Sequence, residues 1–555
     1  MASSFFALFL WILIAGCTAH QAASDEKTGS FSFVDETGSP SAYVTESFLM
    51  HHLGILAHDS LMGRGTGQDG SRMAADYLEQ FYRSDSFSYS NVDIIRQSFT
   101  LEGIFWDSVS YDLYQLDGQD TLFISRSRMD QGTGASFIPL IDGTEIVDAP
   151  VVFAGYGFSR TYSASLASSD GILQGAWVML FEPGADEGVS RRDVVRNFTA
   201  NGANGVIFIN DAEPDEWEVK ATAMSRQLQR PMAIREPGSS FRMSPRTGGT
   251  AVSIHPELAL RMLHLDDFES LDSLRQYWRA NIPDAQPVLT GFRFRNKPEI
   301  NTRLFEEDNI IAVIPGADDD LRNEVVVLTA HYDHMGTGEP DDHNQVVYYG
   351  ADDNASGTAI LLQIAKAFQI KAQKGYQPSR TLVFLHTAAE EWGLYGAFHY
   401  AKNPIFPLNL TIANVNVDMV GFVDNRYSRE EDQNYVYVIG ANMVSSVLDK
   451  LVGQANRATA NLKLDEIYND TGHYLGLYRR SDHWAFAEKN IPFVFFFSGL
   501  HNYYHRPADT PDRINGALLT KRAELITELV WYLAETDERP EVDRKRLGRG
   551  RLPGR

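Results

Sequence analysis

Cysteine is almost absent from this 555-residue chain, because Cys17 is the only one. A single cysteine excludes an intramolecular disulfide, so the fold depends on its buried core. An excess of positive charge is also lacking, since 49 lysine and arginine residues stand against 73 aspartate and glutamate residues, for a formal net charge of -24. Binding to nucleic-acid phosphates requires the opposite balance. We therefore expect no nucleic-acid partner.

A long apolar run is missing as well. The apolar stretch that starts at Phe5 ends at Cys17, which is too short to cross a bilayer as a helix. It is typical of a signal peptide over residues 1–16, and Ile14–Cys17 resembles the lipobox of bacterial lipoproteins. Met1–Ser4 contains no lysine or arginine, so ordinary cleaved secretion stays open. We expect an exported protein, periplasmic or at the cell surface, that contacts the membrane only through a lipid on Cys17 or is otherwise secreted.

The rest of the sequence divides into regions of different composition, and the length of the chain favours two domains. Residues 17–43 are a polar leader, and residues 133–285 contain short β-rich runs separated by glycine. From Asn309 onward, β-branched apolar runs alternate with helical patterns, which predicts an α/β fold with a mixed, mostly parallel central sheet flanked by helices. The basic segment 537–555 is expected to be a mobile tail.

The strands and helices of this α/β region can be placed from the apolar periodicity. The expected strands are 310–314, 325–330, 382–387, 412–417, 435–439 and 492–497. The expected helices are 356–371, 393–400, 444–455 and 518–534.

Acidic and imidazole side chains follow several of these strands. They are His331, Asp333, Asp352, Asp353, Glu390, Glu391 and Asp418. Open α/β sheets bind their ligands at the carboxyl ends of the strands. Buried acids that lie together repel one another unless their pKa values rise or cations lie among them. The pattern therefore predicts a metal site.

Each of these residues alone has an ordinary structural explanation. A strand-end histidine such as His331 is more often satisfied by a hydrogen bond, and an aspartate before a helix serves as its cap. It is the accumulation of such residues that favours a metal site. His334 and Asp341–His343 also carry ligand atoms, but we interpret them as part of a polar loop.

The motifs resemble those of the M28 peptidases, a family of zinc-dependent exopeptidases. The matching segments are His331-Tyr332-Asp333, Asp353-Asn354-Ala355-Ser356-Gly357, Glu390-Glu391, Asn416-Val417-Asp418-Met419, and Tyr504-His505 with Asp509-Thr510 shortly after. The resemblance implies a peptidase domain of zinc exopeptidase-like fold over residues 44–132 and 286–536. It also implies that residues 133–285 are an inserted protease-associated domain.

The resemblance further implies two Zn²⁺ ions. One would be held by Asp353, Glu391 and His505, and the other by His331, Asp353 and Asp418, so that Asp353 bridges them. Two ions held this way acidify a bridging water and stabilise oxygen charge in the transition state. Asp333 would orient His331, and Glu390 would act as the general base. Tyr504 would hydrogen-bond the developing oxyanion, although a structural role is equally consistent with the sequence.

The function implied by the resemblance is an aminopeptidase that hydrolyses the N-terminal residues of peptide substrates. A glutaminyl cyclase-like acyltransferase, a glutamate carboxypeptidase-type enzyme and a catalytically inactive binding relative are the alternatives. The inserted domain counts against the cyclase, and an intact Glu390 counts against the inactive relative. The sequence specifies no oligomeric state.

Overall fold

The computed structural model describes residues 38–544, apart from 85–86, 88–91, 118–119, 130–135, 142–145, 157–170, 184–188, 211–216, 223–229, 240–249, 282–285, 339–344 and 471. The expected signal peptide, Cys17, most of the polar leader, Asp341–His343 and the end of the basic tail lie outside the described residues. Within the described part of the chain, no helix is both long and apolar enough to cross a membrane.

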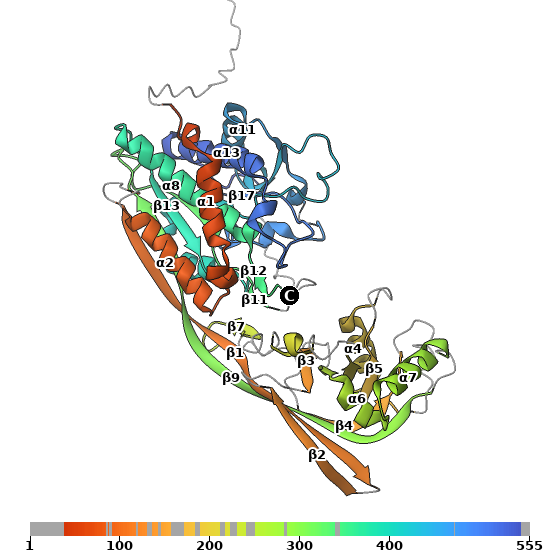
Figure 1. Ribbon diagram of the computed structural model, residues 1–555. Helices are drawn as coiled ribbons and strands as arrows, with labels where there is room; N and C mark the ends of the chain where they lie inside the picture. Colours follow the sequence, from red (N-terminus) through yellow and green to blue (C-terminus); the bar gives the residue numbers. More distant parts are fainter. Residues whose placement is uncertain are drawn as a thin grey trace, which may run out of the picture. The chain divides into compact units, whose positions relative to one another are not determined.

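A mixed sheet forms the centre of the predicted peptidase region (Figure 1). Its strands are β9 (Val288–Ile314), β10 (Val325–His331), β13 (Thr381–Thr387), β14 (Thr411–Val417), β15 (Tyr435–Ile439), β16 (Lys463–Asp465) and β17 (Phe493–Phe497). They lie in the order β16-β15-β17-β14-β10-β13-β9. β10 runs parallel to β13 and β14, and β14 runs parallel to β17, whereas β9 and β15 pair antiparallel to their neighbours β13 and β17. The predicted mixed, mostly parallel α/β sheet is confirmed.

The central strands are apolar throughout because both faces of the sheet are covered. Alternate residues of a strand point to opposite faces, so Leu382 and Phe384 pack in one core while Val383 and Leu385 pack in another. The first core also contains side chains from α1 (Glu46–Leu56), α2 (Asp69–Arg83), α8 (Gly357–Gln373), α11 (Ser446–Ala458) and α13 (Gly516–Glu535). Side chains from α9 (Tyr395–Lys402) and α12 (His483–Ala487) pack into the second core.

Two very long strands connect this sheet to the β-rich region, and the sequence analysis did not foresee them. β1 (Asp93–Asp117) pairs antiparallel with β9 from Asp93 opposite Val313 to Gln115 opposite Phe292. Both strands lie within the expected peptidase segments 44–132 and 286–536, but β9 also pairs antiparallel with β4 (Val147–Phe153) of the β-rich region, with Val147 opposite Asn296. Because β9 has β13 on one side and β4 on the other, the sheet continues without a break from the peptidase region into the β-rich region.

The β-rich region has its own topology and its own core. Its remaining strands are β2 (Asp120–Met129), β3 (Phe137–Ile141), β4 (Val147–Phe153), β5 (Trp177–Phe181), β6 (Gly205–Ile209), β7 (Ala233–Arg235) and β8 (Thr250–Ile254), and its helices are α4 (Arg191–Ala200), α6 (Pro256–Leu263) and α7 (Phe268–Ala280). β4, β5, β6 and β8 are parallel to one another. A separate hydrophobic cluster centred on Trp177 and Phe208 fills this region. Its assignment as a protease-associated domain stays a prediction.

The start of the basic tail is described and is tied to the fold. Arg539 donates to the Glu324 carboxylate at 2.6 Å, and Arg544 donates to Asp449 at 3.0 Å. These ion pairs, together with the contact of Asp543 with Ser446, hold residues 537–544 along the surface.

The strand order brings three of the acidic segments to one edge of the sheet. β10 is flanked by β13 and β14, and all three are parallel, so their carboxyl ends coincide. His331 lies opposite Thr387, and Thr329 lies opposite Asn416. The segments that follow these strands therefore meet above the same edge, as the sequence predicts.

Candidate metal centre

Asp353 lies at the centre of the predicted site, buried in the turn Ala351–Ser356 that leads into α8. Its Oδ1 atom is 3.3 Å from Nε2 of His331, and its Oδ2 atom is 3.1 Å from Nε2 of His505. The two oxygens of one carboxylate thus face imidazoles that are far apart in the sequence. A carboxylate that bridges two cations requires this arrangement.

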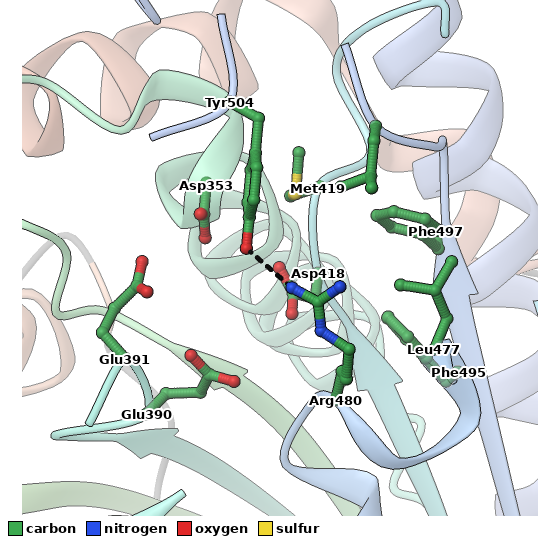
Figure 2. Close-up of a pocket in the computed structure, with 11 residues that line it drawn as sticks. Asp353, Glu390, Glu391, Asp418, Met419, Leu477, Arg480, Phe495, Phe497 and Tyr504 are labelled. Carbon is green, nitrogen blue, oxygen red and sulfur yellow. Dashed lines mark hydrogen bonds between the residues drawn. The ribbon is translucent and has the colours of Figure 1, made fainter. Parts of the chain in front are cut away.

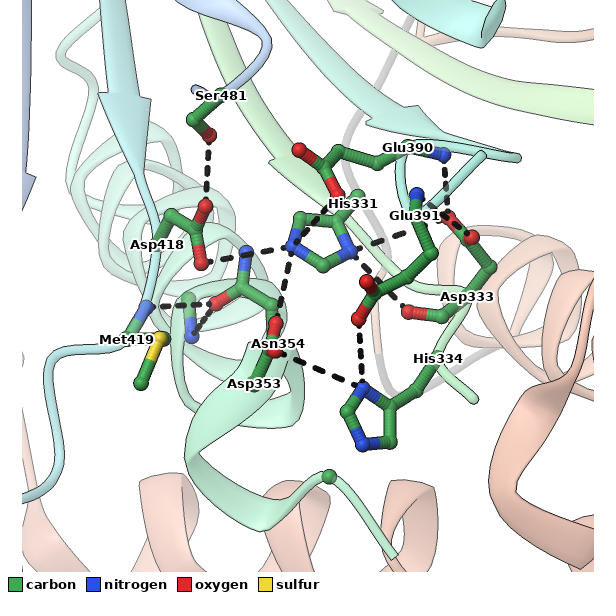
Figure 3. A network of polar contacts seen from close by, with 12 residues as sticks. His331, Asp333, His334, Asp353, Asn354, Glu390, Glu391, Asp418, Met419 and Ser481 are labelled. Atoms are coloured by element: carbon green, nitrogen blue, oxygen red, sulfur yellow. Dashed lines mark hydrogen bonds and ion pairs between the residues drawn. The ribbon is translucent and has the colours of Figure 1, made fainter. Parts of the chain in front are cut away.

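The first group of ligand atoms surrounds His331, at the end of β10. Oδ1 of Asp418 lies 3.4 Å from Nε2 of His331, and the other oxygen of Asp418 accepts a hydrogen bond from the Ser481 hydroxyl at 2.7 Å. Ser481 in turn accepts a hydrogen bond from the Asn416 amide at 2.8 Å. One oxygen of Asp418 is therefore fixed by the protein while the other faces His331 (Figure 3).

The second group surrounds Glu391. Its Oε2 atom is 3.1 Å from Nε2 of His505, and its Oε1 atom is 2.9 Å from Nδ1 of His334. His334, expected in a polar loop, is instead completely buried. His334, Asp353 and Glu391 offer ligand atoms that all lie within 4.8 Å of one another, as do His331, Asp353 and Asp418.

Glu390 lies beside the first group. Its Oε2 atom is 4.0 Å from Nε2 of His331, and its side chain points toward the cluster (Figure 3). Burial raises the pKa of Glu390, and although His331 opposes this shift, Glu391 and Asp418 keep the pKa well above its usual value. A buried carboxyl group with a raised pKa is a strong proton acceptor, which is what a general base requires.

Asp333 contacts the site differently from the role implied by the resemblance. Nδ1 of His331 donates to the backbone carbonyl of Asp333 at 3.1 Å, whereas the Asp333 carboxylate is 3.8 Å away. That carboxylate instead accepts the backbone N–H of Glu390 at 3.0 Å and the Thr66 hydroxyl at 3.0 Å. Asp333 therefore orients His331 through its main chain and holds the turn of Glu390 and Glu391 through its side chain.

The donor atoms fit zinc. They are imidazole nitrogens and carboxylate oxygens, the donors that zinc accepts. Among the described residues, Oδ1 of Asp418 and Nε2 of His505 are buried and have no hydrogen-bond partner. Burial would raise the pKa of Asp353, but His331 and His505 hold it well below its usual value, so this carboxylate is ionised. Cations at this position would satisfy the orphaned atoms and offset the mutual repulsion of the acids.

A small pocket opens beside the acidic cluster (Figure 2). Its acidic wall is formed by Asp353, Glu390, Glu391 and Asp418, and its apolar wall by Met419, Leu477, Phe495, Phe497 and Leu500. Arg480 lies between the two walls and donates to the hydroxyl oxygen of Tyr504 at 3.3 Å. Because a guanidinium group only donates, the Tyr504 hydroxyl keeps its own proton for a bond to substrate.

Two side chains shape the turn that carries Asp353. The Asp509 carboxylate accepts the backbone N–H groups of Asp352 and Asp353 at 3.0 and 3.2 Å. The Asn354 side-chain oxygen accepts the N–H groups of Gly357 and Met419 at 2.9 and 3.2 Å. The second of these contacts fastens the Asp353 turn to the segment that follows Asp418.

Arg64 was not foreseen as a contributor to the site. It is fully buried and donates to the backbone carbonyls of Tyr332 at 2.6 Å, Leu56 at 2.5 Å, Tyr349 at 2.8 Å and Gly350 at 2.9 Å. It therefore joins the segment after His331 to the segment before Asp353. No local pattern reveals such a role, because all four acceptors are main-chain atoms that the sequence does not distinguish.

Replacing Arg64 with lysine is expected to lower the free energy of unfolding by about 2–4 kcal/mol, because an ammonium group cannot satisfy four separated carbonyls and buried acceptors are left unpaired. Urea unfolding of the metal-free chain measures this loss. Arg72→Lys is the matched control, since Arg72 is exposed on α2 and pairs with Asp69 and Asp76 at the surface. Equal stabilities of the two variants would contradict the bracing role of Arg64.

Comparison with known proteins places these residues in a family. Residues 309–530 match the model of peptidase family M28. This match lies within the α/β region. The matched residues include all five predicted ligands, His331, Asp353, Glu391, Asp418 and His505, together with Glu390.

Individual relatives are similar to part of this chain. Aminopeptidase YwaD of Bacillus subtilis is 25% identical over 231 residues, which are 40% of this chain and 44% of that protein. The probable glutamate carboxypeptidase AMP1 of Arabidopsis thaliana is 27% identical over 288 residues, 48% of this chain and 37% of that protein. Less than half the length of either relative is therefore matched. The solved structure of BSAP, a zinc aminopeptidase from Bacillus subtilis, is 18% identical with a TM-score of 0.49, covering 89% of this chain and 96% of that chain.

Proposed function

We propose that this protein is a two-zinc exopeptidase that removes N-terminal residues from peptides. The observation that carries the proposal is the position of Asp353, whose two oxygens face His331 and His505 on opposite sides. A carboxylate placed in this way serves two neighbouring cations. When bound, a pair of zinc ions supplies an acidified water and a polarised substrate carbonyl.

The residues of the chain supply the remaining chemistry. Glu390 takes a proton from the attacking water and delivers it to the leaving amine, because its carboxylate borders the His331 group and faces the pocket. The Tyr504 hydroxyl donates a hydrogen bond to the substrate oxygen on which negative charge develops, and Arg480 holds the phenol in place. Asp333 keeps the Glu390 turn fixed throughout.

The pocket walls favour a substrate with a free N-terminal amine and an apolar first side chain. Carboxylates attract a protonated amine, and Met419, Leu477 and Phe497 offer apolar contact for the side chain. The relative named as a probable glutamate carboxypeptidase, and the presence of Arg480 in the pocket, make C-terminal glutamate substrates the necessary comparison.

A panel of four substrates is expected to separate the possible reactions. We expect zinc-loaded protein to hydrolyse a leucine-terminated peptide with a free amine at least about 100-fold faster, by kcat/KM, than the same peptide with an acetylated N-terminus, because the acidic wall has no charge to bind on the blocked substrate. A peptide that ends in glutamate and a peptide that begins with glutamine complete the panel. Preferred release of C-terminal glutamate, or ring closure of the glutamine, would contradict the aminopeptidase proposal.

A further inference from the structure

His334 lies in the metal centre although none of the matching motifs includes it. Its ring is completely buried, and Nδ1 is 2.9 Å from Oε1 of Glu391 and 3.7 Å from Oδ2 of Asp353. Figure 3 shows this nitrogen directed toward the same two carboxylates. His505 approaches the pair as well, with Nε2 3.1 Å from Oδ2 of Asp353 and 3.1 Å from Oε2 of Glu391.

These separations match the spacing of ligands around one ion. Four donors bound to zinc at about 2.0–2.2 Å in a tetrahedral arrangement lie roughly 3.3–3.5 Å from one another. The four nitrogen–oxygen distances that link His334 and His505 to the carboxylates range from 2.9 to 3.7 Å. Each of the two imidazoles therefore lies at ligand spacing from both carboxylates.

The backbone fixes His334 in this orientation. Its N–H donates to the carbonyl of Arg64 at 3.1 Å, and its ring packs against Gly350. A Cβ atom at Gly350 would lie 2.5 Å from two carbon atoms of the ring, so only glycine leaves room for the imidazole there. Gly350 also has φ of +56°, a conformation that glycine adopts readily. The turn that carries Asp353 is thus built around the His334 ring.

We propose that His334 is the fourth protein ligand of the metal held by Asp353, Glu391 and His505. The inference rests on the proposed two-metal function and deepens it. The two metal positions become unequal, because the other has three protein ligands, His331, Asp353 and Asp418. Closed four-ligand zinc sites are structural, whereas sites with three protein ligands keep a position open for water or substrate. Glu390 borders the three-ligand group, so the general base lies beside the metal that has an open coordination position.

A simple hydrogen bond from His334 to Glu391 is the competing explanation, and an asparagine substitution distinguishes the two. The asparagine amide keeps an N–H donor near the position of imidazole Nδ1 but is a poor zinc ligand. Full-length wild type, His334→Asn and His334→Ala would be stripped of metal and titrated with Zn²⁺ against a chromophoric chelator. We expect the wild type to bind two ions, and both variants to bind one ion normally and the second at least about 100-fold more weakly.

The controls make each outcome decisive. His386→Asn is the control. His386 is also buried, but its ring hydrogen-bonds to the Tyr82 hydroxyl at 2.9 Å and belongs to neither ligand group, so we expect this variant to keep both zinc affinities unchanged. Binding of the second ion by His334→Asn within about threefold of wild type would overturn ligation by His334. A wild type that binds fewer than two ions would instead overturn the two-metal proposal itself, so the two failures are distinguishable.

A spectroscopic count tests the same inference without any variant. X-ray absorption of the wild-type protein loaded with two zinc ions measures the mean number of imidazole ligands per ion. Three ligating histidines predict a mean of about 1.5, whereas His331 and His505 alone give about 1.0. A value near 1.0 would overturn the inference even if the His334 variants failed to fold.

Discussion

Glu390→Ala is expected to bind both zinc ions with wild-type affinity and to lose about 10²–10⁴-fold in kcat, because general-base catalysis contributes that range and the side chain has no place in either ligand group. Its neighbour provides the contrast. Glu391→Ala removes a ligand and is expected to weaken zinc retention first, with activity falling as a consequence. Zinc content and initial rate would be measured together on each variant.

Glu390 and Glu391 can be compared directly because they are adjacent in the chain. Both side chains are buried, carry one carboxylate and follow β13, so a difference in metal content cannot arise from unequal burial or charge. Glu390→Gln adds a nearly isosteric control that keeps volume while removing the base. Equal loss of zinc from the Glu390 and Glu391 variants would contradict the division of roles between them.

Asp353→Asn is expected to reduce the affinity for both ions together, by at least about 100-fold, and to lower kcat/KM by more than 10³-fold. The reason is that each oxygen of Asp353 faces a different imidazole, so neutralising this carboxylate removes a shared ligand and a full negative charge. Metal titration of the stripped protein measures both affinities.

Asp418→Asn is the matched comparison for Asp353. One oxygen of its carboxylate faces His331 and the other accepts a hydrogen bond from Ser481, so we expect the affinity for one ion to fall and the affinity for the other to stay. If Asp353→Asn also weakened only one site, the bridging role would be wrong.

The strand-end residues could be predicted because two rules act together. Apolar runs buried on both faces identify β10, β13 and β14, and parallel neighbours bring their carboxyl ends to one edge. His331 is the last residue of β10, Asp418 directly follows β14, and Glu390 lies three residues beyond the end of β13. Their convergence also depends on the order of the strands, which the sequence pattern did not specify and which places β10 between β13 and β14.

Other contributors had no comparable signal. His334 stands in a stretch rich in polar residues, and its burial depends on the contact of its ring with Gly350, which is distant in sequence. Arg64 binds only main-chain carbonyls. Most of β9 was missed because its middle, Arg293–Asp308, carries many charged residues, although pairing with β1 keeps it extended. Long-range pairing, not local preference, decides these features.

A crystal structure of the zinc-soaked protein, with anomalous diffraction recorded at the zinc edge, would locate the metal positions. We expect two anomalous peaks about 3.5–4 Å apart on either side of the Asp353 carboxylate, one beside His331 and Asp418 and the other beside Glu391 and His505. A single peak, or peaks that do not share Asp353, would contradict a pair of metal ions bridged by Asp353.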